Sequence, residues 1–144
     1  MCSFSEVHDH ELMWAHYADR FGGICVAYSL TKLLKYLPED VSFVRIYYDE
    51  KVPTVRRTDH EPIHLAKMVL SYKNYRWLYE REWRMFARLG RAHYHKVACV
   101  SRLYLGSRID SDKKEQIRRA MKPLGIPTSE MNVGKYTLNF APRS

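Results

Sequence analysis

Eight residues near the middle of the chain combine two glutamates, two arginines and three large aromatic residues, and they read Trp77-Leu78-Tyr79-Glu80-Arg81-Glu82-Trp83-Arg84. The spacing predicts a β-strand, in which alternate side chains point to opposite faces of the sheet. Glu80, Glu82 and Arg84 would then share one face. Two carboxylates two residues apart perturb each other's pKa unless a cation, a ligand or water lies between them. The stretch therefore predicts either a site or an ordinary exposed sheet face with cross-strand ion pairs.

The segments on either side of this stretch predict a mixed architecture. Strands are expected at residues 2–6, 24–28, 43–48 and 97–105, helices at residues 12–18, 31–37, 60–72 and 111–121, and a hairpin at residues 131–133 and 136–140. Ser111 is the expected N-cap of the last helix. Strands and helices do not alternate regularly, so we expect one α+β domain over residues 1–144, with a mixed, mainly antiparallel sheet and three to four helices.

The composition indicates a basic protein without a membrane segment. There are 24 Lys and Arg residues against 16 Asp and Glu residues, a formal net charge of +8. Such a charge favours polyanionic partners such as nucleotides or nucleic acid. No apolar run is long enough to cross a membrane, and the N-terminus lacks a signal-peptide pattern. Cys2, Cys25 and Cys99 form no CxxC pair, so we expect no metal and a cytoplasmic location. The sequence indicates no oligomeric state.

Several motifs of the chain resemble a known bacterial family. They are Cys2-Ser3-Phe4-Ser5-Glu6, Leu12-Met13-Trp14-Ala15-His16-Tyr17-Ala18-Asp19, Gly23-Ile24-Cys25-Val26, the set Lys73, Trp77, Tyr79-Glu80 and Glu82-Trp83-Arg84, and Tyr104-Leu105-Gly106-Ser107-Arg108-Ile109. Together they resemble the family called domain of unknown function 2971. Longer members carry an N-terminal section with an Asn-Asp-Pro-Phe type motif that this sequence lacks, so we expect the chain to correspond to their C-terminal portion. Members are often encoded near phage-defence and toxin-type genes, which implies such a role here.

Two short motifs also resemble those of ADP-ribosyltransferases. Glu80-Arg81-Glu82 is similar to their Glu-x-Glu pair, and Ser3-Phe4-Ser5 is similar to a Ser-x-Ser strand. Cleavage of nicotinamide from NAD builds an oxocarbenium-like centre that a carboxylate stabilises. The resemblance implies that Glu82 contacts the ribose and that Glu80 orients or deprotonates the acceptor, with NAD as the candidate cofactor. The early Arg or His that the class also uses is missing.

Two other readings stay open. Basic residues interleaved with aromatic residues suit a nucleic-acid-binding module or a nuclease, with His16, His93 or His95 as general acid or base. The basic residues are Arg76, Arg81, Arg84, Arg88, Arg91 and Lys96. The third reading is a non-catalytic structural or interaction domain.

Under the enzyme hypotheses we expect one cleft that is faced by residues 4–17 and residues 77–84. The candidate catalytic residues are Glu82, Glu80 and His16. The candidate substrate-binding residues are Ser5, Glu6, Trp14, Tyr17, Lys73, Trp77, Tyr79 and Arg84.

Overall fold

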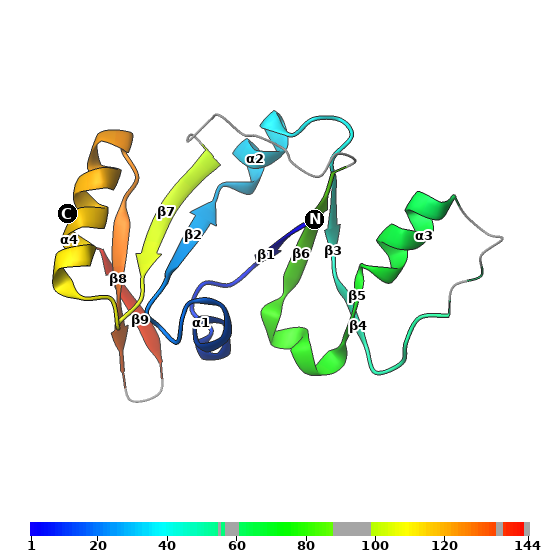
Figure 1. Ribbon diagram of the computed structural model, residues 1–144, viewed down its shortest axis with the longest axis horizontal. Helices are drawn as coiled ribbons and strands as arrows, with labels where there is room; N and C mark the ends of the chain where they lie inside the picture. The colour runs from blue at the N-terminus through cyan, green and yellow to red at the C-terminus, as the bar shows by residue number, and fades with distance from the viewer. Residues whose placement is uncertain (55, 57–60, 88–98, 135–136, 143–144) are drawn as a thin grey trace. The chain divides into compact units, whose positions relative to one another are not determined.

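The chain folds into two units, each assembled from two separate stretches of sequence. Unit 1 comprises Met1–Val7 and Pro38–Ala92, and unit 2 comprises His8–Leu37 and His93–Ser144. The computed structural model describes residues 1–54, 56, 61–87, 99–134 and 137–142 (Figure 1).

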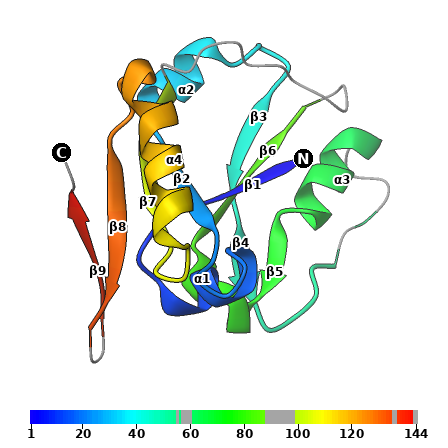
Figure 2. The ribbon, with the colours of Figure 1, turned by 60° about the vertical axis from the view of Figure 1, so that its left-hand side comes forward.

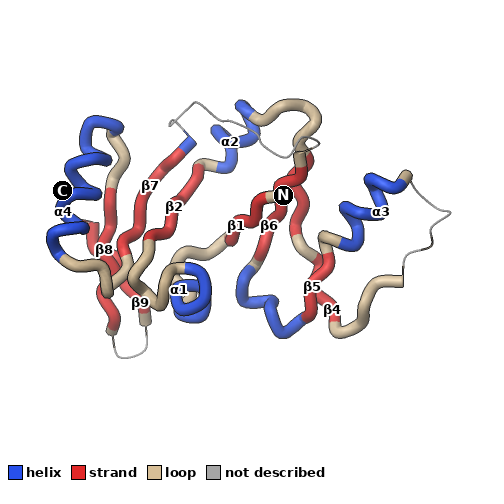
Figure 3. The backbone as a smooth tube through the Cα atoms, in the orientation of Figure 1, coloured by secondary structure: helices blue, strands red, loops and turns tan. Residues whose placement is uncertain are grey.

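Unit 1 is built on a three-stranded antiparallel sheet with the strand order β1-β6-β3. Its strands are β1 (Cys2–Ser5), β3 (Ser42–Arg45) and β6 (Glu82–Phe86). The remaining elements are the parallel pair β4 (Tyr47–Asp49) and β5 (Tyr72–Asn74), helix α3 (Pro62–Val69) and the 3₁₀ helix η1 (Tyr75–Glu80) (Figure 3). In the sheet register, Ser5 lies opposite Glu82 and Ser3 lies opposite Arg84. The serine strand therefore runs directly beside the strand that carries Glu82.

Residues 77–84 do not form one strand, and the strand expected for the first half of this stretch is wrong. Asn74 caps η1 because its side chain accepts a hydrogen bond from the Arg76 N–H at 3.0 Å. The helix ends at Arg81, which has a left-handed backbone with φ 44°, and β6 begins at the next residue. Glu80 is therefore the last residue of a helix and Glu82 is the first residue of a strand, so strand alternation does not place their side chains on one face.

Unit 2 contains a four-stranded sheet with the order β2-β7-β8-β9. Its strands are β2 (Ile24–Tyr28), β7 (Val100–Leu105), β8 (Thr128–Val133) and β9 (Leu138–Pro142). Its helices are α1 (Glu11–Tyr17), α2 (Leu30–Tyr36), α4 (Ser111–Met121) and the 3₁₀ helix η3 (Lys122–Leu124). β7 and β8 are parallel because α4 connects them, and the other pairs in this sheet are antiparallel (Figure 2).

The apolar clusters that the structure describes belong to unit 2. One contains Trp14, Ala18, Met131 and Leu138, and the other contains Leu103, Leu105 and Ile126. In unit 1, the described buried residues are Ile46 and Phe86 together with the polar residues Ser71, Glu80 and Glu82. Unit 1 therefore places charged side chains in its interior, where they must be paired.

The predicted α+β class with mainly antiparallel pairing is confirmed, and the described residues include four α-helices. Several boundaries differ from the expectation. The strand expected at residues 43–48 breaks at the buried Ile46, and the helix expected at residues 60–72 is the shorter α3, followed by Tyr72 in β5. Asp110, not Ser111, is the N-cap of α4, and its side chain accepts from the Lys113 N–H at 2.8 Å. Among the described helices, none has both the length and the apolar character of a membrane span.

Candidate functional site

Lys73 joins the two glutamates of residues 77–84. The Lys73 ammonium donates to the Glu80 carboxylate, and its Nζ lies 3.1 Å from Glu82 Oε2. The side chains of Glu80 and Glu82 are only 3% and 7% exposed, whereas Lys73 is 21% exposed. The expected meeting of Lys73, Glu80 and Glu82 therefore takes place in unit 1, through a shared cation.

Arg84 holds the other side of the Glu82 carboxylate. Its Nε lies 2.7 Å from Oε1 and its Nη2 lies 3.1 Å from Oε2, the two-pronged geometry that gives strong and directional pairing. The same guanidinium donates to the carbonyl of Leu70. The Glu82 N–H donates to the Tyr48 hydroxyl oxygen at 2.8 Å, so the backbone of Glu82 is fixed as well as its side chain.

Lys73, Glu80, Glu82 and Arg84 form an ionic network, and its contacts decide the ionisation of Glu82 and Lys73. Burial raises the pKa of the Glu82 carboxyl, but hydrogen bonds from Arg84, Ser3 and Lys73 outweigh burial and lower that pKa to about 2. Burial lowers the pKa of Lys73, but its hydrogen bonds to Glu80 and Glu82 prevail and raise it. At neutral pH Glu82 is an anion and Lys73 is a cation, so Lys73 is not a nucleophile there.

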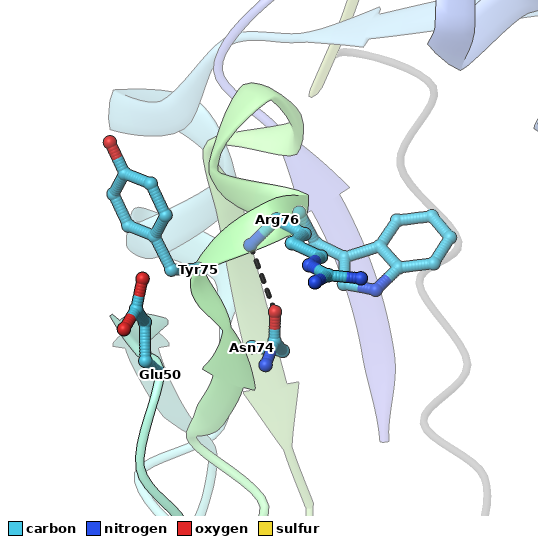
Figure 4. A pocket seen from close by; sticks show the side chains of 5 residues that line it. Glu50, Asn74, Tyr75 and Arg76 are labelled. Atoms are coloured by element: carbon cyan, nitrogen blue, oxygen red, sulfur yellow. Dashed lines mark hydrogen bonds between the residues drawn. The ribbon is translucent and has the colours of Figure 1, made fainter.

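A shallow pocket adjoins this ionic network. It has a volume of about 490 Å³ and is lined by Glu50, Asn74, Tyr75, Arg76 and Trp77. In Figure 4 the Glu50 carboxylate and the Tyr75 ring lie on one side of Asn74 and the Arg76 guanidinium lies on the other. The Lys73 ammonium lies 5.1 Å from the centre of the Trp77 ring, a cation–π contact that connects the pocket wall to the network.

The pocket offers chemistry that the buried carboxylates do not. Tyr75 is 53% exposed and Trp77 is 38% exposed, and Arg76 and Glu50 are also exposed. Tyr79, whose ring centre lies 6.0 Å from that of Trp77, is half-buried, and burial raises the pKa of its hydroxyl. Aromatic faces, a guanidinium and a carboxylate are therefore available to a bound molecule.

Sequence reasoning missed Glu50 and Asn74 as pocket residues. Asn74 carried one usable signal, because asparagine is a favoured residue immediately before a helix. Glu50 carried none, since it follows a short strand that lies far from residues 74–77 in sequence and is brought near them by the β4–β5 pairing.

Ser5 and Glu6 also belong to unit 1, but they take different partners. The Ser5 hydroxyl donates to the Glu80 carbonyl at 2.7 Å, next to the ionic network. Glu6 instead accepts from the Trp83 indole at 2.8 Å and pairs with Arg81 at 2.7 Å and Arg45 at 3.1 Å. The hydrogen bond from Trp83 leads the contacts that lower the pKa of Glu6. Glu6 thus holds the chain beside η1 and β6.

The other three candidate residues lie on α1, which belongs to unit 2. Trp14 is 2% exposed, its indole donates to the His8 carbonyl at 2.6 Å, and it packs in the first apolar cluster. His16 and Tyr17 are exposed. Within unit 1 the structure brings together Ser5, Lys73, Glu80, Glu82 and Arg84, and the shared cleft with α1 stays a prediction. Of the expected basic stretch, Arg88, Arg91 and Lys96 lie outside the described residues, as do the candidate acid or base residues His93 and His95.

Comparison with known proteins gives one match. The model of a family described as "Protein of unknown function (DUF2971)" matches residues 13–85, just over half of the chain. That stretch contains the ionic network and the pocket residues but not Ser3, Ser5 or Glu6. No curated protein and no solved structure matches the chain.

Proposed function

The chain belongs to the family of proteins of unknown function DUF2971, and from the geometry of its site we propose that it binds a nucleotide in the pocket of Glu50 and residues 74–77. One observation carries the proposal: two exposed aromatic rings and a guanidinium surround a pocket of about 490 Å³. Stacking of a base on an aromatic ring contributes roughly 1–3 kcal/mol, and a guanidinium suits a phosphate. The volume lies in the range of small-molecule sites.

The burial of the carboxylates supports binding over immediate acid–base chemistry. Glu80 and Glu82 are both nearly inaccessible, and each already has a cationic partner. A general acid or base must reach the proton that it transfers. In the proposal, the ionic network has the role of fixing η1, and η1 presents Tyr75, Arg76 and Trp77 to the ligand.

Isothermal titration calorimetry of the full chain tests the proposal. The ligands are NAD, AMP and a short single-stranded oligonucleotide. The oligonucleotide is included because a protein with a positive net charge favours polyanions. Trp77→Ala is expected to weaken binding roughly 5- to 150-fold, as the loss of one stacked base implies. Arg76→Gln is expected to weaken binding of the phosphate-bearing ligands about tenfold or more. Arg119→Gln, an exposed site on α4, is the matched control. Absence of saturable binding to the wild-type chain would refute the proposal, as would unchanged affinity in both pocket variants.

A second candidate function is transfer of ADP-ribose from NAD to a nucleic acid or protein acceptor. It is favoured by the Ser3 hydroxyl bonding the ionised Glu82 carboxylate, with Ser5 directly opposite Glu82 on β1. In that reaction the bond from the ribose carbon to nicotinamide breaks, nicotinamide leaves with the electron pair, and the acceptor bonds to the same carbon. Glu82 would stabilise the cationic ribose after exchanging its contact with Lys73, and Glu80 would take the acceptor proton. A phage-defence or toxin-type role in the cytoplasm belongs to this candidate.

Nicotinamide release separates the two functions. The chain is incubated with NAD and DNA, RNA or protein acceptors, and wild type is compared with Glu82→Gln. A transferase loses release in this variant, whereas a binding domain shows no release in either protein. Release that Glu82→Gln leaves unchanged would remove Glu82 from the chemistry.

A further inference from the structure

We propose that the pocket selects ribonucleotides with a free 2′-hydroxyl, and that the Glu50 carboxylate determines this by accepting a hydrogen bond from the ribose. The inference rests on the proposed nucleotide binding and deepens it by naming the ligand class. It concerns Glu50, a residue outside the ionic network.

The position of Glu50 follows from a parallel strand pair. β4 pairs with β5 so that Asp49 lies opposite Asn74, the last residue of β5. Glu50 directly follows β4, and η1 directly follows β5. Both segments therefore leave the same ends of adjacent parallel strands, which places them side by side. The same placement brings Glu50 together with Tyr75 on one side of the pocket (Figure 4).

The bonding needs of the lining side chains define the ligand. A carboxylate only accepts hydrogen bonds, and Glu50 is exposed and forms no ion pair with any other described residue. A guanidinium only donates, and that of Arg76 likewise forms no ion pair within the described part of the chain. The Asn74 side-chain oxygen is already used by the Arg76 N–H at 3.0 Å. A ligand that satisfies the pocket thus brings hydroxyl donors for Glu50, an anion for Arg76 and a flat ring for the aromatic residues.

A ribonucleotide has these three groups, and changes at its 2′ position act on Glu50 directly. A 2′-deoxy sugar removes a donor and leaves the carboxylate without that bond. A 2′-phosphate replaces the donor by an anion, so two negative groups would lie side by side. Both changes are expected to weaken binding while the base and the 5′-phosphate keep their own contacts.

Calorimetric titration of the full chain with three ligands tests the inference: AMP, 2′-deoxy-AMP and adenosine 2′,5′-bisphosphate. We expect the wild-type chain to bind AMP roughly tenfold more tightly than the deoxy ligand, as loss of a hydrogen bond to a charged group implies. The bisphosphate should bind more weakly than AMP. In Glu50→Gln, which keeps size and removes charge, the bisphosphate should gain affinity relative to AMP.

Glu39→Gln, another exposed glutamate of unit 1, should keep the wild-type ratios and is the control. Equal wild-type affinities for AMP and 2′-deoxy-AMP would overturn the inference, and so would a preference that survives in both Glu50→Gln and Glu50→Ala. These results leave nucleotide binding itself intact, so they differ from failure of the proposed function, in which none of the three ligands binds.

Discussion

Replacement of Lys73 by methionine should destabilise the protein in a strongly pH-dependent way. The substitution keeps most of the side-chain volume and removes the ammonium that lies between two carboxylates that are 3% and 7% exposed. Removal of one partner from a buried ion pair costs about 3–5 kcal/mol, because a charge is left uncompensated. We expect a loss of that size in the free energy of unfolding at pH 8.

At lower pH the same variant should lose less stability. Without their shared cation, the two buried carboxylates repel each other, and this repulsion raises the pKa of one of them. The folded variant therefore takes up a proton that the unfolded chain does not hold at pH 5 to 8. A proton bound preferentially by the folded state makes stability increase as the pH falls. The difference between wild type and Lys73→Met should therefore shrink from pH 8 to pH 5.

Urea denaturation at pH 5, 6.5 and 8 measures this difference. Lys67→Met is the matched control, since the Lys67 ammonium donates to the Ser42 hydroxyl at 2.8 Å and forms no ion pair among the described residues. The double variant Lys73→Met/Glu80→Gln should recover part of the stability and lose the pH dependence. A loss below about 1 kcal/mol, typical of an exposed pair, or a loss equal at all three pH values would refute the reasoning.

Three further perturbations probe other features. The pKa of Glu82 falls from 4.5 to about 2 on folding, so this group contributes about 3 kcal/mol of stability. That contribution is present above pH 4.5 and is lost as the pH falls toward 2. In an acid titration, the stability of Glu82→Gln should therefore decline less steeply than that of the wild type over this pH window. Gly106→Ala should cost more than about 3 kcal/mol in thermal or urea unfolding, because the new Cβ would meet the backbone of Phe21 and lie 2.8 Å from the Gly23 carbonyl oxygen. Gly125→Ala should cost only about 1 kcal/mol, because Gly125 has φ 64° and open space around it. Similar losses at the two sites would contradict this. Asp110→Ala should lower stability by about 1 kcal/mol and Ser111→Ala by much less, since Asp110 is the cap; the reverse order in chemical denaturation would restore Ser111 to that role.

Much of the fold could be predicted because local patterns determine it. Alternating or continuous apolar runs mark β1, β2 and β7, and α4 follows its polar and apolar periodicity. The break at Arg81 could not be predicted in this way. A left-handed residue other than glycine costs about 1–2 kcal/mol and is chosen by its surroundings, here the pairing of Arg81 with Glu6 and the capture of Glu80 by Lys73.

The candidate site was predictable in its residue types and less so in its geometry. Lys73, Glu80, Glu82 and Arg84 do assemble, with Ser5 beside them, but the shared Lys73 joins the two glutamates instead of a common strand face. The sequence could not reveal that both carboxylates are buried and paired, because burial depends on how η1 and β6 fold back on β5. The pocket depends in the same way on strand pairing, and Glu50 joins it from a distant segment.

The path of the chain through the two units affects the order in which the protein can fold during synthesis. The chain enters unit 1, leaves it after Val7, returns at Pro38 and leaves again after Ala92. Strand β1 leaves the ribosome before its register partners Glu82 to Met85, which follow only after α1, β2 and α2 have been made. Until then β1 lacks these partners and exposes an unpaired strand edge. It must wait for a partner of high sequence separation, which slows folding. A variant that delays the arrival of β6, such as an insertion after the exposed Val52, should therefore expose this strand for longer. We expect it to favour aggregation of the nascent chain over loss of stability in the finished protein.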